Sequence, residues 1–289
     1  SSGTSRLTIK AEQKSGHFRM QRGMPVLAET PAGGSVEELR LLWDATHRLG
    51  LRLQVAEQYW LQPMLSAMLN VVRAGWLGAP DYVMESQAHD YHGLSLIRKA
   101  LDVGHSPVRI TGTSWRHSLA ETDSRQGPVT PPHLGERTQR LALLEFADRK
   151  RAIHDFTDFQ YRSFLFNQHL TIRDLRGETS DRRIRMLNAN DEPVSMNLIP
   201  QRSSISETTV SVTAGTNALY RSPFPCSGLR DDETAIATIM DSMEAYLDSG
   251  VELYPLADAL QDSYLSILLA RACGRPGTTI VSKPQPWNQ

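Results

Sequence analysis

Residues 24–59 constrain the fold more than any other stretch, because strand and helix signals follow one another there without a gap. The first signal is a short apolar run over residues 25–28 that stops before Pro31. Proline lacks a backbone donor and disfavours helical geometry for the residue before it, here Thr30. The sequence therefore predicts a buried strand that ends at this proline.

A helix and a second strand are expected directly afterwards. Ser35 and Glu38 have the spacing of a capping box, in which each side chain satisfies a free backbone N–H at a helix start. A helix should thus begin at Val36, and Gly50 should end it. Residues 51–55 then alternate apolar and polar side chains, as strands do. The order strand, helix, parallel strand indicates an α/β unit.

The rest of the chain combines predicted helices with short extended runs. Helical spacing of apolar residues predicts helices after Pro63 and over residues 92–101, and two more over residues 231–248 and 255–272. Between them come short extended runs separated by turn signals: residues 108–115, 141–146, 152–159, 170–175 and 183–187. Residues 126–135, rich in proline and glycine, are expected to be a surface loop. The predicted fold class is α/β and α+β: the remnant of a Rossmann-like parallel sheet, then an open, mainly antiparallel sheet covered by helices on one face.

Composition narrows the class of partner. With 31 basic and 32 acidic residues among 289, the net charge is −1, which gives no field for attracting nucleic acid or a membrane surface. No apolar stretch approaches the roughly 20 residues of a membrane helix, and no signal peptide is apparent. Cys226 and Cys273 have neither metal-site nor dithiol spacing, which favours a reducing cytoplasm and no metal. We therefore expect a small-molecule partner.

Several short motifs, in matching order, resemble one enzyme family. Residues 26–31 resemble a strand that ends in Glu-Lys-Pro, and residues 55–63 resemble the Arg-x-x-Pro turn, with Trp60 in the arginine's place. Residues 72–78 and 92–101 are similar to a helix exit and to a helix that opens with histidine, and residues 253–266 resemble the closing helix. The family is that of glucose-fructose oxidoreductase and inositol dehydrogenase (Gfo/Idh/MocA), and the similarity covers residues 24–282.

The resemblance implies a two-domain oxidoreductase that uses NAD or NADP. Residues 1–60 would be an incomplete dinucleotide-binding portion, and residues 61–289 the substrate-binding α+β domain. Hydride transfer between the nicotinamide and a sugar, cyclitol or related hydroxy compound is the implied reaction. Glu29, Thr30 and Pro31 would then lie beside the cofactor. Family members commonly form oligomers through the C-terminal sheet, so a homo-oligomer is expected.

His92 is the candidate catalytic residue, since the resemblance gives this histidine the proton-carrying role. Imidazole titrates near neutral pH, as the removal of a hydroxyl proton requires. The alternative is that His92 is an ordinary residue at the start of a helix. His89 and Asp90 are substrate-site candidates, and Asp90 would orient one of the imidazoles; both residues would otherwise belong to a solvated loop.

Further candidates come from position alone. Gln58 and Tyr59 follow a parallel strand, and open α/β sheets bind ligands at that end of their strands. Tyr161, beside Arg162, would contact the apolar face of a sugar; ordinary sheet packing is the alternative.

Departures from the family pattern affect the cofactor most. Thr30 stands where the family has lysine, and Ala88 where it usually has aspartate. No Gly-x-Gly-x-x-Gly lies between a strand and a helix, and Gly33 with Gly34 is better explained as a turn before Ser35. The chain is thus expected to lack most of its dinucleotide-binding half. The alternative function is a non-catalytic sugar-binding or dimerisation module.

Overall fold

A small parallel unit begins the computed structural model, which describes residues 24–124 and 126–288. It consists of β1 (Val26–Ala28), α2 (Val36–Leu49) and β2 (Leu53–Val55), and the two strands pair in parallel. The Ser35 hydroxyl accepts a hydrogen bond from the Glu38 N–H at 3.2 Å, and Gly50 ends α2 at a φ of 60°. The predicted strand, helix, parallel strand order is confirmed, and both helix signals mark the observed bounds.

A nine-stranded sheet dominates the described part of the chain, with its strands in the order β10-β9-β8-β7-β3-β6-β5-β4-β14. Neighbours are antiparallel except for the parallel pair β3 and β6. Its strands are β3 (Tyr82–Ser86), β4 (Val108–Ser124), β5 (Gly127–Phe146), β6 (Arg151–Thr157), β7 (His169–Asp174), β8 (Gly177–Ser180), β9 (Arg183–Leu187), β10 (Pro193–Asn197) and β14 (Thr279–Val281). The predicted fold class is confirmed by this large, mainly antiparallel sheet next to the small parallel one.

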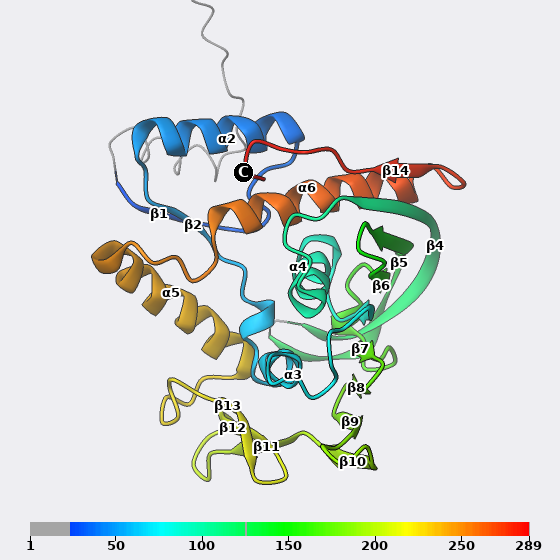
Figure 1. The fold of residues 1–289 in the computed structure, drawn as a ribbon, viewed down its shortest axis with the longest axis vertical. Helices are drawn as coiled ribbons and strands as arrows, with labels where there is room; N and C mark the ends of the chain where they lie inside the picture. Colours follow the sequence, from blue (N-terminus) through cyan, green and yellow to red (C-terminus); the bar gives the residue numbers. More distant parts are fainter. Residues whose placement is uncertain (1–23, 125, 289) are drawn as a thin grey trace, which may run out of the picture.

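Helices and a second small sheet complete the described fold. The helices are η1 (Tyr59–Leu61), α3 (Pro63–Arg73), α4 (Asp90–Leu101), η2 (Gln160–Arg162), α5 (Asp231–Ser249) and α6 (Leu256–Cys273). The small antiparallel sheet contains β11 (Ile199–Arg202), β12 (Thr209–Ala214) and β13 (Asn217–Arg221). Figure 1 shows α4 between the large sheet and α6, with α2 running alongside α6.

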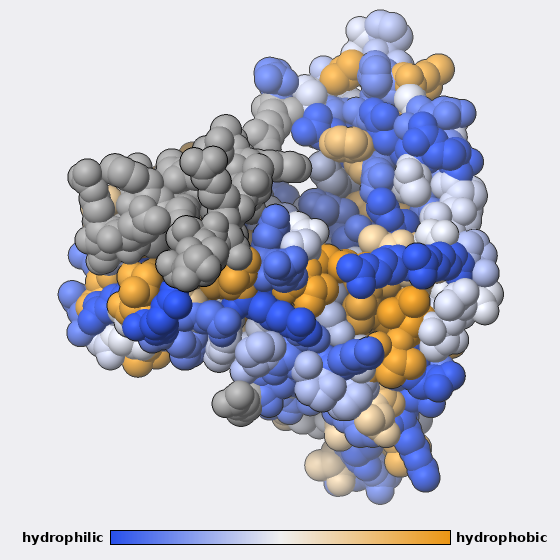
Figure 2. Space-filling view, turned by 90° about the horizontal axis from the view of Figure 1, so that it is seen from above, coloured by the Kyte–Doolittle hydropathy of each residue, from blue (hydrophilic) through white to orange (hydrophobic). Residues whose placement is uncertain are grey.

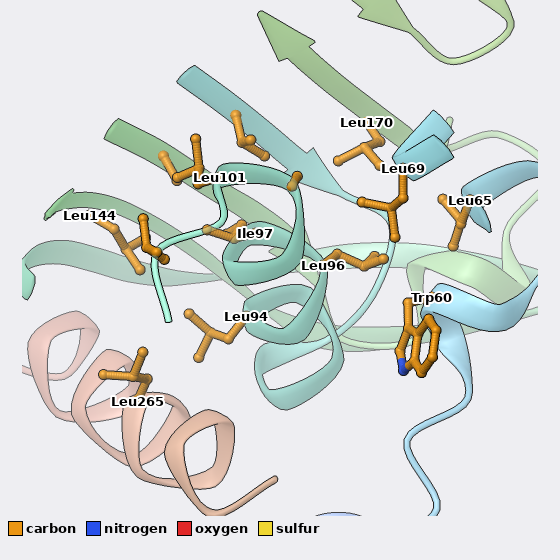
Figure 3. Close-up of a cluster of buried hydrophobic side chains, with 14 of the residues drawn as sticks. Trp60, Leu65, Leu69, Leu94, Leu96, Ile97, Leu101, Leu144, Leu170 and Leu265 are labelled. Carbon is orange, nitrogen blue, oxygen red and sulfur yellow. The ribbon is translucent and has the colours of Figure 1, made fainter. Parts of the chain in front are cut away.

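The main core lies around α4, which is buried on nearly all sides. Leu94, Ile97 and Leu101 of this helix are fully buried, together with Leu144 of β5 and Leu265 of α6 (Figure 3). Residues 91–98, 100 and 101 of this helix are all buried, Arg98 among them, so α4 is enclosed by its neighbours. The sheet on one side and α6 on the other therefore hold α4 in one place, and α4 carries His92.

The C-terminal segment is a strap across the helices. Trp287 is 1% exposed, and its indole N–H donates to Gln261 of α6 at 2.9 Å. Arg40 of α2 donates to Gln285 at 3.0 Å. The strap thus ties α2 to α6, and with it the small parallel unit to the rest of the fold.

One expectation about the sheet was wrong. Residues 126–135 are not a surface loop: from Gly127 onward they belong to β5, which pairs with β4 in a long hairpin (Ala120 opposite Leu134). Backbone hydrogen bonding along this hairpin outweighs the local turn signals. The neighbours β3 and β6 are parallel, because β4 and β5 lie between them in the sequence and provide the long crossover that a parallel pair needs.

Among the described residues, no helix is both long and apolar enough to cross a bilayer. The surface seen from the α2 side carries separate hydrophobic patches among mostly hydrophilic residues (Figure 2).

The packing around α4 makes a stability prediction. Leu94→Ala removes a fully buried side chain and should lower the free energy of unfolding by about 2–5 kcal/mol, because a cavity remains. Leu175→Ala is the matched control, since Leu175 is 91% exposed and its truncation should change stability by no more than about 0.5 kcal/mol. Urea unfolding followed by circular dichroism measures both. Equal effects would contradict the placement of α4.

Candidate active site

The candidate site lies at the ends of the two parallel strands. Thr30 follows β1, and Glu57 and Tyr59 follow β2. A hydrogen bond of 2.8 Å from the Ala56 N–H to the Ala28 carbonyl continues the pairing beyond the strands. Because β1 and β2 end at the same edge of the sheet, the side chains that follow them are brought together, as in other open α/β sheets.

His92 reaches this edge from the first turn of α4. Its Nδ1 lies 2.5 Å from Glu57 Oε2, and the two side chains are 6% and 0% exposed. The other oxygen of Glu57 accepts the Tyr59 N–H at 3.0 Å. A buried carboxylate is stable only when its oxygens are satisfied, and both oxygens of Glu57 are.

This contact determines which imidazole nitrogen is available. An ionised carboxylate can only accept, so we assign the proton to His92 Nδ1, which donates to Glu57. In the neutral ring, Nε2 then has a lone pair. Nε2 faces the Thr30 hydroxyl at 3.4 Å, which can donate to it. The site therefore presents a proton acceptor next to a hydroxyl at the strand edge.

Aromatic rings enclose the imidazole. Tyr59 stacks on His92 with 4.4 Å between ring centroids, and His89 meets it edge-on at 4.9 Å. Burial raises the pKa of the Tyr59 phenol well above its usual range, so this hydroxyl is a neutral hydrogen-bonding group. The ring centroid of Tyr161 lies 6.3 Å from that of His89.

The structure brings some of the predicted site residues together. Thr30, Tyr59, His89 and His92 form one cluster, defined by the contacts above. Tyr161 lies at its margin. Glu29 and Pro31 flank Thr30 and are exposed, and Gln58 is half-buried beside Tyr59.

The orienting carboxylate was assigned to the wrong residue. Asp90 does not hold His92; its Oδ1 faces His154 of β6 at 3.7 Å, and Glu57 holds His92 instead. The available signal was the position of Glu57, two residues after β2 at the ligand-binding end of the strand. Sequence proximity favoured Asp90, but on a helix residues two apart do not face each other.

Glu29 and Pro31 are exposed on either side of Thr30, at the edge where the sequence resemblance would put a nicotinamide. The start of α2, where a phosphate would bind, is already occupied: Glu38 accepts the Gly34 N–H at 2.8 Å. A Cβ on Gly33 would lie 3.1 Å from Leu39, so this glycine serves packing. Residues 24–124 and 126–288 thus contain no phosphate cradle at this helix.

A hollow elsewhere on the surface does not compete with this site. It lies along β7 to β10, has a volume of about 590 Å³, and is lined by residues such as Arg173, Leu175 and Met186. None of the residues of the His92 cluster lines it. We place the site at the strand ends because the paired carboxylate and imidazole are there.

Comparison with known proteins yields structural matches alone. No protein-family model and no curated protein matches the sequence. An oxidoreductase from Agrobacterium radiobacter, solved with NAD+, L-tartaric acid and magnesium, has a TM-score of 0.64 and 15% identity over 94% of this chain and 77% of that one. An NAD-binding oxidoreductase from Klebsiella pneumoniae has a TM-score of 0.61 and 12% identity, over 92% and 76%. Biliverdin reductase from Synechocystis, solved with biliverdin and NADP+, has a TM-score of 0.57 and 15% identity, over 91% and 77%.

These likenesses establish the fold. The chain has the fold of NAD(P)-dependent oxidoreductases of the Gfo/Idh/MocA type, as the sequence resemblance indicated.

The contact between Glu57 and His92 makes a prediction. Glu57→Gln keeps an oxygen for the Tyr59 N–H but turns an amide donor toward the His92 Nδ1–H, so two buried donors face each other. The free energy of unfolding should fall by about 1–3 kcal/mol. The control is Glu136→Gln, whose 68% exposed side chain pairs with Arg116 and should contribute no more than about 0.5 kcal/mol. A change at position 57 no larger than the control's would refute the buried contact.

Proposed function

We propose that this chain is the substrate-handling part of an NAD(P)-dependent oxidoreductase. The reaction is hydride transfer between nicotinamide and a sugar, cyclitol or related hydroxy compound. The observation that supports it is the arrangement at the strand edge: His92 Nδ1 is bonded to Glu57, and Nε2 is directed toward a hydroxyl. Oxidation of a secondary alcohol needs a base at this position, because the hydroxyl proton must leave as the carbon loses hydride.

Residues of this chain account for the transfer of the hydroxyl proton. A substrate hydroxyl in the place of the Thr30 hydroxyl would donate to His92 Nε2 and then transfer its proton there. Glu57 stabilises the resulting imidazolium and fixes the ring plane. When bound, the nicotinamide supplies the hydride acceptor, and Glu29, Thr30 and Pro31 would flank it. Gln58, Tyr59, His89, Asp90 and Tyr161 are the candidates for contacting the substrate.

Two features support the class of substrate. The neutral Tyr59 hydroxyl, the half-buried Gln58 and the imidazole of His89 are groups that hydrogen-bond to hydroxyls. The Agrobacterium structure was solved with L-tartaric acid, a hydroxy acid, together with NAD+. The Synechocystis structure contains NADP+, so the fold accommodates either nucleotide.

A non-catalytic module is the second candidate, and one observation favours it. At the start of α2 the Gly34 N–H is not available to a pyrophosphate, since Glu38 already accepts its hydrogen bond.

We also infer a cytoplasmic location, since Cys226 and Cys273 are both free thiols.

A mutational test addresses the proposed chemistry. In a form of the protein that turns over a polyol with NAD or NADP, His92→Ala should lower kcat by roughly 10²- to 10⁴-fold, the usual effect of losing a general base. His133→Ala is the control, because His133 has a 64% exposed side chain outside the cluster. Binding of NADH or NADPH by this chain in a fluorescence titration would support the oxidoreductase over the module. Unchanged turnover in His92→Ala would reject the role of His92.

The open face of the large sheet supports the proposed homo-oligomer. Along β4 and β5, alternate side chains point toward the helices or away from them, and Trp115, Leu141 and Leu143 on the outer face are 46%, 37% and 42% exposed. Apolar side chains gathered on one sheet face are typical of an interface. We propose that a second copy covers them.

This interface is tested by sedimentation velocity. Leu143→Lys should shift the protein to a smaller species, because it places a charge within the apolar face. Leu175→Lys, at a 91% exposed position between β7 and β8, should leave the distribution unchanged. If the unsubstituted chain is a monomer at all concentrations, the proposed interface is wrong.

A further inference from the structure

A second buried pair of carboxylate and imidazole lies under the helix that carries His92. Glu85 of β3 and His154 of β6 are opposite each other in the parallel pairing of these strands. Glu85 Oε2 lies 2.6 Å from His154 Nδ1, and both side chains are 0% exposed. The chemistry proposed for His92 does not use this pair.

Glu85 holds the chain where it enters α4. Its Oε1 accepts the backbone N–H groups of Gln87 at 2.7 Å and Ala88 at 2.8 Å. Gly93, in the first turn of α4, leaves space for the carboxylate: a Cβ there would lie 2.4 Å from Glu85 Oε2. The Glu85 carboxylate therefore contacts the residues before His92 and passes close to the backbone directly after it.

His154 connects this carboxylate to Asp90, the first residue of α4. His154 Nε2 lies 3.7 Å from Asp90 Oδ1, and Arg140 Nη1 of β5 is 3.7 Å from the same oxygen. Arg140 is in turn 2.7 Å from Asp158. Charges of alternating sign thus run from Glu85 through His154, Asp90 and Arg140 to Asp158.

The charge of His154 follows from these neighbours. Burial alone lowers the pKa of this imidazole, but the Glu85 and Asp90 carboxylates outweigh burial and raise the pKa to about 9. For Asp90, burial raises the pKa, and His154 with Arg140 brings it below its usual value. Near pH 7 His154 is therefore a cation between two anions.

Few other titratable groups face this cluster. Asp155 is next to His154 on β6, and His89 is next to Asp90. From α6, the Cys273 thiol lies near Asp90, and burial raises the pKa of this thiol to about 11. At pH 7 Cys273 is neutral, so the Glu85 and Asp90 carboxylates dominate the field at His154.

We propose that the pair of Glu85 and His154 is a positioning device for the first turn of α4. The pair bonds to the backbone before His92 and packs against Gly93 after it, and thereby sets the approach of that imidazole to Glu57 and Thr30. His154 acts through Glu85 and Asp90 and has no contact with a reacting atom. Its importance for turnover rests on the proposed function, whereas its effect on the geometry of His92 does not.

The pH dependence of stability tests the charge of His154. Since its pKa in the folded protein is raised above the ordinary 6.5, the cation stabilises the fold fully below about pH 6.5, and this contribution is lost as pH rises through about 9. His154→Asn keeps a donor for Glu85 but removes the charge. The wild-type melting temperature should fall by roughly 3 °C or more over this pH range, and the variant's should not. His169→Asn is the control: its imidazole also pairs with a carboxylate, Asp181, but is 30% exposed.

Imidazole NMR tests the positioning without any substrate. In the wild type, the ¹H–¹⁵N resonances of His92 should show an inflection near pH 9, reporting the deprotonation of His154. The inflection should vanish in His154→Asn and persist in His169→Asn. If His154→Asn does not fold, Asp90→Asn should move the inflection to lower pH, because it removes one of the two carboxylates that raise the pKa.

Each outcome decides the proposal. If the inflection is absent in wild type, persists in His154→Asn or is unmoved in Asp90→Asn, His154 does not position His92. If the inflection behaves as expected while His92→Ala turns over normally, the positioning device stands and the proposed function fails.

Discussion

The site depends on one buried contact, in which the Glu57 carboxylate holds His92 Nδ1 at 2.5 Å. The contact joins the end of the small parallel sheet to the first turn of α4, so it connects two parts of the fold that are built differently. An uncompensated carboxylate at this depth would be costly, which makes the geometry of the two elements interdependent. It also leaves Nε2 as the nitrogen that faces the Thr30 hydroxyl. The proposed proton transfer depends on this choice of nitrogen.

The rest of the fold keeps Glu57 and His92 in place. The buried side chains of α4 pack between the large sheet and α6, and the strap ending at Trp287 ties α2 to α6. On the other side, Glu85 bonds to the backbone that leads into α4. A hydrogen bond of 3.2 Å from the Ala32 N–H to Ser263 fixes the loop after Thr30 to α6. His92 and Thr30 are thus each positioned by rigid elements, as an acid–base site requires.

The bounds of helices and strands were predicted correctly where they depend only on neighbouring residues. Ser35 and Gly50 marked the bounds of α2, and the run over residues 25–28 located β1. The hairpin of β4 and β5 was only partly predictable, since prolines suggested a loop and the pairing with a distant strand decided otherwise. Partners of buried side chains were the least predictable. Glu57 and His92 are 35 residues apart, and Glu85 and His154 are 69 apart, so neither pairing leaves a trace in local sequence spacing.

The central claim is that His92 Nε2 receives a substrate hydroxyl at the end of β1. A crystal structure of the protein soaked with a panel of polyols and hydroxy acids tests it most directly, and it requires no cofactor. We expect a ligand hydroxyl within about 2.6–3.2 Å of His92 Nε2, taking the place of the Thr30 hydroxyl while the contact with Glu57 stays unchanged. Ligands bound only at sites remote from His92, or a His92 ring turned away from Glu57, would contradict the account.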